Sequence, residues 1–382
     1  MSYSAWQYIL RKYYNSSPDG RFRDMNSGID FSYALHNSLF NIEYSTVGEI
    51  QHSDFFDHTA LRDRNMHFSY PVVRPHAEGA DSKAVILLHG LNERSWDKYL
   101  SWAFSLAENT GKSVILFPIA FHMNRSPEDW RNPRFMRQYV EKRVKEMPGV
   151  RSLSFANVAL SERLTMQPQQ FFFSGYQSAN DLLQLIDSLN SGTHPSFRTG
   201  TTVDFFAYSI GVLLSQVLLL ANPENRFDRS RFFFFSGGSV FEGMQGISRH
   251  ILDNRAFDRI FHFYCEEIAR EKKDSGVFDD LLHHTGLGSA FLAMTSYRNL
   301  RNMKGKIFRK LRGQMEGVSL SKDKVIPSGQ VMRTMDGAFV EEWDFPYPYS
   351  HENPFPLFGN SALELVDRAF DKVFTKAGLF LA

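Results

Sequence analysis

Residues 201–220, "TTVDFFAYSIGVLLSQVLLL", change from a strand pattern to a helix pattern with no room for a loop between them. The first half carries bulky apolar residues, and the second repeats apolar residues at helical spacing. Ser209 stands at the junction, with the small residues Ala207 and Gly211 two places before and after it. A turn this sharp presses those two positions against neighbouring backbone. The pattern therefore predicts a strand–turn–helix unit that exposes the oxygen of Ser209.

A serine at such a junction has two interpretations. It can be a nucleophile elbow, in which the helix that begins at Ile210 aims backbone N–H groups at the space above the serine oxygen. It can also be a residue that caps the helix after a buried strand. The motif alone leaves both interpretations open.

Further apolar strands are expected in "AVILLHG", "SVILFPIA" and "RFFFFSGG", each followed by a loop or a helix pattern. "QQFFFSG" has the same appearance and is interpreted as a buried strand or a pocket wall. Strands that alternate with helices indicate a parallel sheet covered on both faces. The fold class expected is therefore α/β, with a mostly parallel central sheet flanked by helices.

Two helices carry clear terminal signals. In "SWDKYLSWAFSLAENTG", Ser95 is expected to cap the start and Gly111 to close the end. In "SALELVDRAFDKVFTKAG", Ser361 and Glu364 form a capping box and Gly378 is expected to end the helix.

The alternation of strands and helices also sets expected boundaries. Residues 66–241 and 306–382 form the core, and residues 242–305 read as helices without strands, which predicts a helical cap inserted into the core. Residues 1–65 mix aromatic and polar residues with no clean period and are interpreted as an N-terminal extension packed on the core.

Four segments, "AVILLHGLNERSW", "DFFAYSIGV", "SLSKDKVIP" and "YSHENPF", occur in the order in which the α/β-hydrolase superfamily carries its characteristic parts. The chain resembles that superfamily from about residue 68 to the C-terminus, and the resemblance implies the α/β-hydrolase fold. One departure is Ala207, where the commoner elbow has glycine. Another is the lack of a glycine triplet after His89, which disfavours the esterase branch that carries one.

The superfamily places its acid and its base after the serine, in that order. Asp323 follows a predicted strand end and resembles the acid, and its alternative interpretation is a solvated loop aspartate. His351 follows the last predicted strand and resembles the base, although a chain with 13 histidines also places some in loops by chance. Weaker candidates for the acid are Asp336, Asp344 and Glu242.

The resemblance also implies an oxyanion hole made by the backbone N–H groups of Leu91 and Ile210. His89 is expected to brace the loop rather than to act in catalysis. Arg125 either holds an acidic substrate group or pairs with Glu128 or Asp129. The candidate pocket residues are His89, Asn92, Tyr208, His122, Arg125 and Trp130.

Composition argues against several partners. The chain has 43 Lys and Arg against 42 Asp and Glu, with no block of like charges, which disfavours a nucleic-acid partner. The phenylalanine clusters are shorter than the roughly 20 apolar residues of a membrane span, so no transmembrane segment is expected. The start shows no secretory pattern and Cys265 is the single cysteine, so a reducing, cytoplasmic location is expected.

No cofactor or metal is expected. The sequence has no P-loop and no dinucleotide glycine fingerprint. "FDDLLHH" at residues 278–284 pairs acids with histidines at helical spacing, but a third metal ligand is not evident and a solvated helix explains it better. Cys265 is interpreted as a buried, inert thiol.

The sequence therefore predicts a serine hydrolase that cleaves a carboxylic ester, or a related acyl bond, through Ser209, His351 and Asp323 and an acyl-enzyme intermediate. Aromatic residues in the expected cap favour a small-molecule acyl substrate that is apolar in part. A non-catalytic protein that binds a ligand or partner in the same pocket is the alternative. An acyltransferase that uses the same three residues is a further one, since fold does not fix the reaction. The sequence leaves the oligomeric state open.

Overall fold

The computed structural model describes residues 2–16, 22–23, 30–40, 58–75, 79–268, 276–303, 307–335, 340–357 and 362–382. Within these residues, nine strands form one sheet in the order β1-β2-β3-β5-β4-β6-β7-β8-β9. The strands are β1 (Phe22–Arg23), β2 (Asp30–Asn37), β3 (His67–Arg74), β4 (Lys83–Leu88), β5 (Ser113–Phe117), β6 (Thr202–Tyr208), β7 (Phe232–Phe235), β8 (Met315–Leu320) and β9 (Val340–Trp343).

Most of this sheet is parallel. Strands β5, β4, β6, β7, β8 and β9 run parallel to one another, and β1, β2 and β3 add an antiparallel edge. The crossover of β4 and β5 and the antiparallel first strands are the strand order of the α/β-hydrolase fold. The expected fold class is confirmed.

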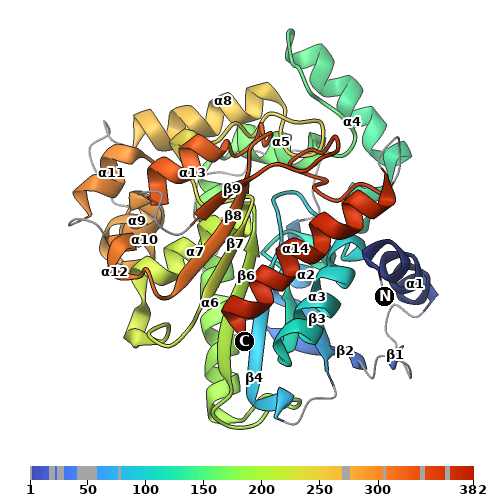
Figure 1. Ribbon diagram of the computed structural model, residues 1–382. Coiled ribbons are helices and arrows are strands. Elements are labelled where there is room, and N and C mark those ends of the chain that lie inside the picture. Colours follow the sequence, from blue (N-terminus) through green and yellow to red (C-terminus); the bar gives the residue numbers. More distant parts are fainter. Residues whose placement is uncertain are drawn as a thin grey trace.

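Helices cover both faces of the sheet (Figure 1). They are α1 (Tyr3–Ser16), α2 (His58–Met66), α3 (Asp97–Thr110), α4 (Pro133–Glu146), α5 (Val158–Met166), α6 (Gln169–Ser191), α7 (Ile210–Ala221), α8 (Asn254–His262), α9 (Val277–His284), α10 (Gly286–Ala293), α11 (Tyr297–Asn302), α12 (Ile307–Lys310), α13 (Ser328–Met335) and α14 (Leu363–Leu381).

Alternating residues of each central strand enter different cores, because successive side chains of a strand point to opposite faces. In β6, Phe205 and Ala207 join a core with α6, α7, α8 and α10. Phe206 and Tyr208 join the opposite core, with α1, α3 and α14. Both faces of β6 are therefore buried, which explains why its sequence is apolar almost throughout.

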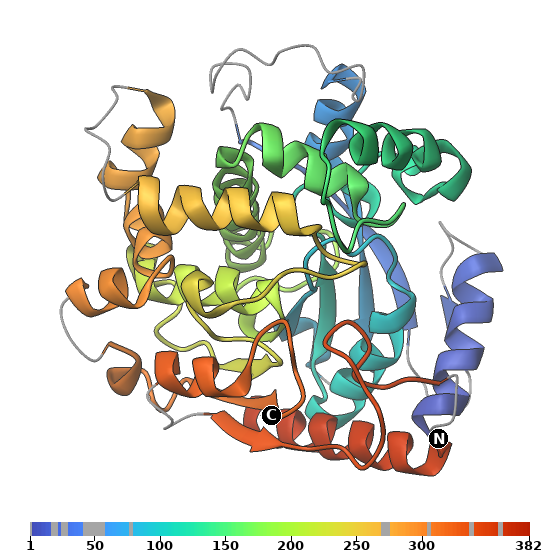
Figure 2. The same ribbon diagram turned by 90° about the horizontal axis from the view of Figure 1, so that it is seen from above.

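Helices also lie across one end of the sheet. Between β7 and β8 the chain forms α8 to α12, and α4 and α5 come between β5 and α6. In Figures 1 and 2, α5 and α8 cross beyond the ends of the strands. Asn92, which follows β4, donates to the carbonyls of Ala156 and His250, just before α5 and α8. These helices therefore cover the carboxyl ends of the parallel strands.

The start of the chain contributes to the sheet and to one helical layer. All eight residues of β2 pair with β3. Helix α1 packs beside α3 and α14, where Tyr3 stacks on Phe370 at 4.2 Å and the backbone N–H of Ser4 donates to Asp367 at 2.8 Å. The division into extension, core and cap stays a prediction.

Two sequence-based expectations about helices are wrong. "QQFFFSG" is the first part of α6, so its interpretation as a strand is wrong, whereas its interpretation as a pocket wall agrees with the structure, since Phe171 and Phe172 line a cavity. Phe171, Phe172 and Phe173 are all buried, so the sequence shows no polar face there that would mark a helix. Gly378 does not end α14, which continues to Leu381. A Cβ at Gly378 would lie 2.4 Å from Cβ of Asn109, so the glycine permits close contact with α3.

Three further predictions concern the ends of α3 and α14. Gly111 closes α3 in a left-handed conformation with φ 65°, as expected. The Ser95 hydroxyl accepts from the backbone N–H of Asp97 at 3.2 Å, at the start of the same helix. Ser361 lies outside the described residues, so its capping box stays a prediction.

Candidate active site

Ser209 occupies a strained turn between β6 and α7. Its φ and ψ are 57° and −122°, a conformation that costs a non-glycine residue about 1–3 kcal/mol and persists only where the surroundings enforce it. Strand β6 ends at Tyr208 and α7 begins at Ile210, so the serine is the whole connection. This geometry matches the elbow interpretation of the motif, and the side chain of Ser209 makes no capping hydrogen bond.

Close contacts with the backbone require glycine at two positions near Ser209. A Cβ at Gly211 would lie 2.8 Å from the carbonyl oxygen of Leu88 and 2.9 Å from that of His89. A Cβ at Gly237 would lie 2.8 Å from the carbonyl oxygen of Ser209. Backbone cannot yield by this much, so any side chain at these two positions would displace the turn.

The structure brings Ser209 together with the two residues predicted to act with it. The Ser209 Oγ lies 2.7 Å from Nε2 of His351, and Nδ1 of that ring lies 2.7 Å from Oδ2 of Asp323. All three residues are 4% exposed, although 114 residues separate Ser209 from Asp323 in the chain. They come from the ends of β6 and β8 and from the loop before α14.

The hydrogen bonds of Asp323 determine which histidine nitrogen carries the proton. Its Oδ1 accepts from the backbone N–H groups of Val325 and Ile326, both at 2.9 Å. Oδ2 is then an acceptor, so Nδ1 of His351 carries the hydrogen and Nε2 presents its lone pair to Ser209. That is the orientation a general base needs.

The weaker candidates for the acid lie elsewhere. Glu242 accepts from the backbone N–H of Tyr297 at the start of α11. Asp344 pairs with Lys322 at 2.9 Å on the surface. Asp336 lies outside the described residues.

Two contacts that the sequence did not reveal hold the loop of His351. The Tyr208 hydroxyl donates to the backbone carbonyl of His351, and the two rings stack with centroids 5.5 Å apart. Lys98, which pairs with Glu93, donates to the carbonyl of Glu352 at 3.1 Å. The signal for Tyr208 was its place beside the serine, but nothing in the sequence connected Lys98 with residue 352.

The backbone N–H groups of Leu91 and Ile210 donate to no other residue in the part of the chain that the structure describes. Leu91 follows Gly90, where a Cβ would lie 3.4 Å from Cβ of Ser209. Ile210 directly follows Ser209, and Leu91 directly follows a residue close to Ser209, so their role as an oxyanion hole stays a prediction.

His89 braces this loop instead of facing the serine. Its Nε2 accepts from the backbone N–H of Ile119 at 2.9 Å, so Nδ1 carries the hydrogen and donates to the carbonyl of Gly90 at 2.8 Å. Burial holds the pKa of His89 well below its usual value. The ring is neutral and structural, as the sequence indicated.

One cavity is lined by Ser209, and a second is lined by the residue that follows it, Ile210. The larger, about 640 Å³ and open to solvent, is lined by Ser209, His351 and the candidate pocket residues Asn92, Tyr208 and Trp130. The smaller, about 50 Å³, is lined by both Leu91 and Ile210 and by His122. Burial lowers the pKa of His122 to about 4, so that ring is uncharged.

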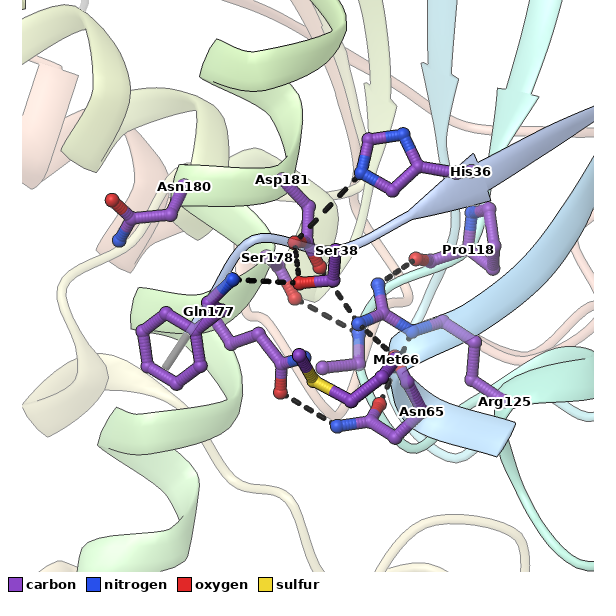
Figure 3. Close-up of polar contacts among 12 residues, drawn as sticks. His36, Ser38, Asn65, Met66, Pro118, Arg125, Gln177, Ser178, Asn180 and Asp181 are labelled. Atoms are coloured by element: carbon purple, nitrogen blue, oxygen red, sulfur yellow. Dashed lines mark hydrogen bonds and ion pairs between the residues drawn. The ribbon is translucent and has the colours of Figure 1, made fainter. Parts of the chain in front are cut away.

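Arg125 belongs to neither of these cavities, and the expectation that it lines the pocket is wrong. Its guanidinium is fully buried and pairs with Asp181 at 2.7 Å, not with the expected Glu128 or Asp129 as its ion-pair partner. It also donates to Oδ1 of Asn65 at 3.1 Å (Figure 3). A fixed cation of this kind joins α2, the loop after β5 and α6, and is structural.

The remaining sequence candidates carry no site. Burial raises the pKa of the Cys265 thiol to about 12, which agrees with an inert thiol. Within the described ranges, no group of three or more His, Cys, Asp or Glu side chains is arranged to hold a metal ion. In the same ranges, no helix is both long enough and apolar enough to cross a membrane.

The strand order, together with a serine turn after β6 and a histidine and an aspartate from later loops, defines the α/β-hydrolase superfamily as the class of this protein. Within that class, the chain belongs to DUF6051, a family of unknown function whose sequence pattern matches residues 16–382. No curated protein matches the chain.

Several solved structures are similar to this one, at low sequence identity. The esterase LipW from Mycobacterium marinum is 10% identical, with a TM-score of 0.47, over 98% of this chain and 87% of that one. Carboxyl esterase 2 from Tuber melanosporum is 10% identical, with a TM-score of 0.44, over 83% and 82%. A thermostable esterase from Pseudomonas putida is 11% identical, with a TM-score of 0.40, over 100% and 92%. The chemistry of the site is therefore inferred from its own geometry.

Proposed function

We propose that this protein is a serine hydrolase that cleaves a carboxylic ester through an acyl-enzyme intermediate. The observation that carries the proposal is the 2.7 Å contact between Oγ of Ser209, at its strained turn, and Nε2 of His351. A serine hydroxyl is a weak nucleophile until a base takes its proton, and the base works only in the correct tautomer and orientation. Asp323 fixes both through its 2.7 Å contact with Nδ1.

The reaction follows from these contacts. The Ser209 Oγ attacks the carbonyl carbon while Nε2 of His351 takes its proton, and Asp323 stabilises the imidazolium. The N–H groups of Leu91 and Ile210 hold the oxyanion of the tetrahedral intermediate, a role that typically contributes a factor of about 10²–10³ per donor. The imidazolium gives its proton to the departing alcohol, which leaves the acyl group on the serine. Water then attacks the acyl carbon while His351 takes its proton, and the bond to Ser209 breaks as the imidazolium returns that proton to Oγ, which releases the acid.

Labelling with a fluorophosphonate tests this proposal, because such reagents modify activated serines. We expect the purified protein to be labelled and the Ser209→Ala variant not to be. Ser236→Ala is a matched control: Ser236 follows β7 as Ser209 follows β6, is buried with φ 45°, and its hydroxyl has no hydrogen-bond partner among the described residues. Labelling that persists in Ser209→Ala contradicts the proposal.

A folded wild-type protein that neither reacts with the reagent nor hydrolyses any ester would favour the non-catalytic, ligand-binding alternative. Transfer to an acceptor other than water is distinguished by adding small alcohols to the ester assay and measuring the new ester. The cytoplasmic location stays a prediction.

A further inference from the structure

The two cavities lined by Ser209 and by Ile210 differ in size and in chemistry. The small cavity is walled by aromatic and aliphatic side chains from three helices, among them Phe171 and Phe172 of α6, Leu214 of α7 and Phe291 of α10. No Lys, Arg, Asp or Glu lines it. The large cavity is lined by charged residues of both signs, including Glu93, Arg131 and Glu352.

The position of the candidate oxyanion donors relates both cavities to the scissile bond. Leu91 lines both cavities, Ile210 lines the small one, and Ser209 and His351 line the large one. A carbonyl oxygen held by Leu91 and Ile210 therefore lies at the boundary between them. One substituent of the carbonyl carbon enters the apolar cavity, and the other lies on the side of His351, where the leaving oxygen must receive its proton.

We infer that the substrate is an ester with a short, uncharged acyl chain of two to four carbons and a larger, polar alcohol. The acyl chain occupies the small cavity and the alcohol occupies the large one. This assignment rests on the proposed function, because it uses the same serine and the same proton transfer.

The length limit comes from volume. One water-sized group needs about 10–15 Å³, so a cavity of about 50 Å³ accommodates roughly three to five such groups. A longer chain would have to displace the walls, which are packed phenylalanines such as Phe172, in contact with Phe291 at a centroid separation of 5.0 Å.

The exclusion of charge comes from the polar groups that the small cavity offers. Those that line it include the neutral His122 and Ser174, whose hydroxyl donates to the carbonyl of Phe171 at 3.3 Å. A second carboxylate at the end of the acyl chain would lose its water and gain no cation in return, which is strongly unfavourable. Dicarboxylate half-esters are therefore poor substrates.

Gly175 is one of the residues that line the small cavity. It lies inside the 23-residue helix α6, and a Cβ added there would meet no atom within 4 Å. Glycine in the interior of a helix is less stable than alanine by roughly 0.5–1 kcal/mol. No steric contact requires it, so its effect is the open space that it leaves in the cavity wall.

Two series of esters test the assignment. p-Nitrophenyl esters from acetate to octanoate vary the acyl chain, and acetate esters of alcohols of increasing size vary the leaving group. We expect kcat/KM to fall at least tenfold from butyrate to octanoate, and to change much less with the alcohol. The p-nitrophenyl half-ester of succinate is expected to react at least tenfold more slowly than the butyrate.

Gly175→Leu should fill the cavity. The ratio of kcat/KM for butyrate to that for acetate is expected to fall at least tenfold, in line with the 10- to 200-fold effects of single methylenes in apolar pockets. Gly313→Leu is the matched control. Gly313 is exposed in the turn before β8, at the end of the strand opposite to Asp323, and a Cβ there also meets no atom within 4 Å. Its ratio should equal that of the wild type.

The outcomes separate this inference from the proposed function. Equal hydrolysis of butyrate and octanoate, a length limit on the alcohol instead of the acyl chain, or an unchanged ratio in Gly175→Leu would each overturn the inference while leaving a serine hydrolase. Absence of both ester hydrolysis and labelling in the folded protein would overturn the proposed function and the inference with it.

Discussion

Two buried histidine–aspartate pairs lie in this protein, and they differ in what else the carboxylate binds. In the candidate site, Nδ1 of His351 lies 2.7 Å from Asp323. In the second pair, Nε2 of His36 lies 3.9 Å from Asp181 (Figure 3). Both aspartates are at most 4% exposed, so burial alone does not distinguish the two pairs.

The two pairs differ because Arg125, a buried cation, binds Asp181. Asp181 accepts from Arg125 through one oxygen and from Ser38 through the other, so its charge is already compensated. Burial lowers the pKa of His36 to about 4, and Arg125 reinforces that shift against the attraction of Asp181. Among the described residues, Asp323 forms no ion pair with a Lys or Arg, and His351 is the group it orients. The same two residue types thus form a structural centre in one place and a candidate catalytic pair in the other.

Replacing each aspartate by asparagine gives the largest contrast. Asp323→Asn should lower kcat by about 10⁴, because the amide can donate to Nδ1 and thereby favours the wrong tautomer of His351. Asp181→Asn should leave kcat per folded molecule within a few-fold of the wild type. Kinetics on a short-chain p-nitrophenyl ester, with the folded fraction measured by circular dichroism, check both. Equal losses of kcat in the two variants would show that the pairs are not distinct in role.

Removing Arg125 should affect the stability of the protein rather than its catalysis. Arg125→Met leaves Asp181 buried and uncompensated, and should lower the free energy of unfolding by about 3–5 kcal/mol. Arg137→Met is the control, since the Arg137–Glu141 pair is exposed and lies on one helix, and it should have no measurable effect. Denaturant titration followed by tryptophan fluorescence measures the change. An Arg125 variant as stable as the wild type would contradict the structural assignment of this centre.

The depressed pKa of His36 predicts how stability depends on pH. The unfolded chain takes up a proton near pH 6.5, whereas the folded chain resists it until about pH 4. Stability from this group is therefore fully present above pH 6.5 and is lost as the pH falls toward 4. At pH 5 the loss should be about 2 kcal/mol, from 1.5 pH units at 1.36 kcal/mol each.

His36→Gln should remove that part of the pH dependence. The difference in unfolding free energy between wild type and variant, measured at pH 7 and again at pH 5, isolates His36 from the other buried histidines. An identical difference at both pH values would mean that His36 takes up its proton in the folded chain as readily as in the unfolded one.

The smallest effect concerns the support of His351. Tyr208→Phe removes the hydroxyl that donates to the carbonyl of His351 but keeps the stacked ring. An unpaired buried carbonyl costs about 1–3 kcal/mol, and a slightly displaced imidazole should lower kcat by up to tenfold without a matching rise in KM. Ser38→Ala removes a hydroxyl from the second centre and should leave kcat unchanged. Steady-state kinetics on one ester compare the two variants.

Local patterns in the sequence were sufficient to predict much of the central sheet and the turn at Ser209. The alternation of strands and helices predicted the parallel sheet, and the small residues around Ser209 predicted its turn, because both are consequences of neighbouring residues. Resemblance to a superfamily added Asp323 and His351, which local pattern left among several candidates. Their catalytic roles stay predictions until the variants are measured.

Where the sequence failed, the cause was a contact between distant segments. Residues 169–175 resemble a strand but begin a helix, and the helical pattern is hidden because three successive phenylalanines, Phe171, Phe172 and Phe173, are all buried. Arg125 looked like a pocket residue because its partner, Asp181, lies 56 residues away in α6. Gly378 looked like a helix end, but its reason is the closeness of Asn109 in α3.

By itself the sequence determined the elements whose signals repeat within a few residues: the central parallel strands, the serine turn and the closing glycine of α3. Only the tertiary structure decided which aspartate meets a cation and which meets a histidine beside a serine. It also placed Gly175 in the wall of a cavity of about 50 Å³. The physical reason is that burial and charge compensation are properties of packed neighbours, and those neighbours come from segments far apart in the chain.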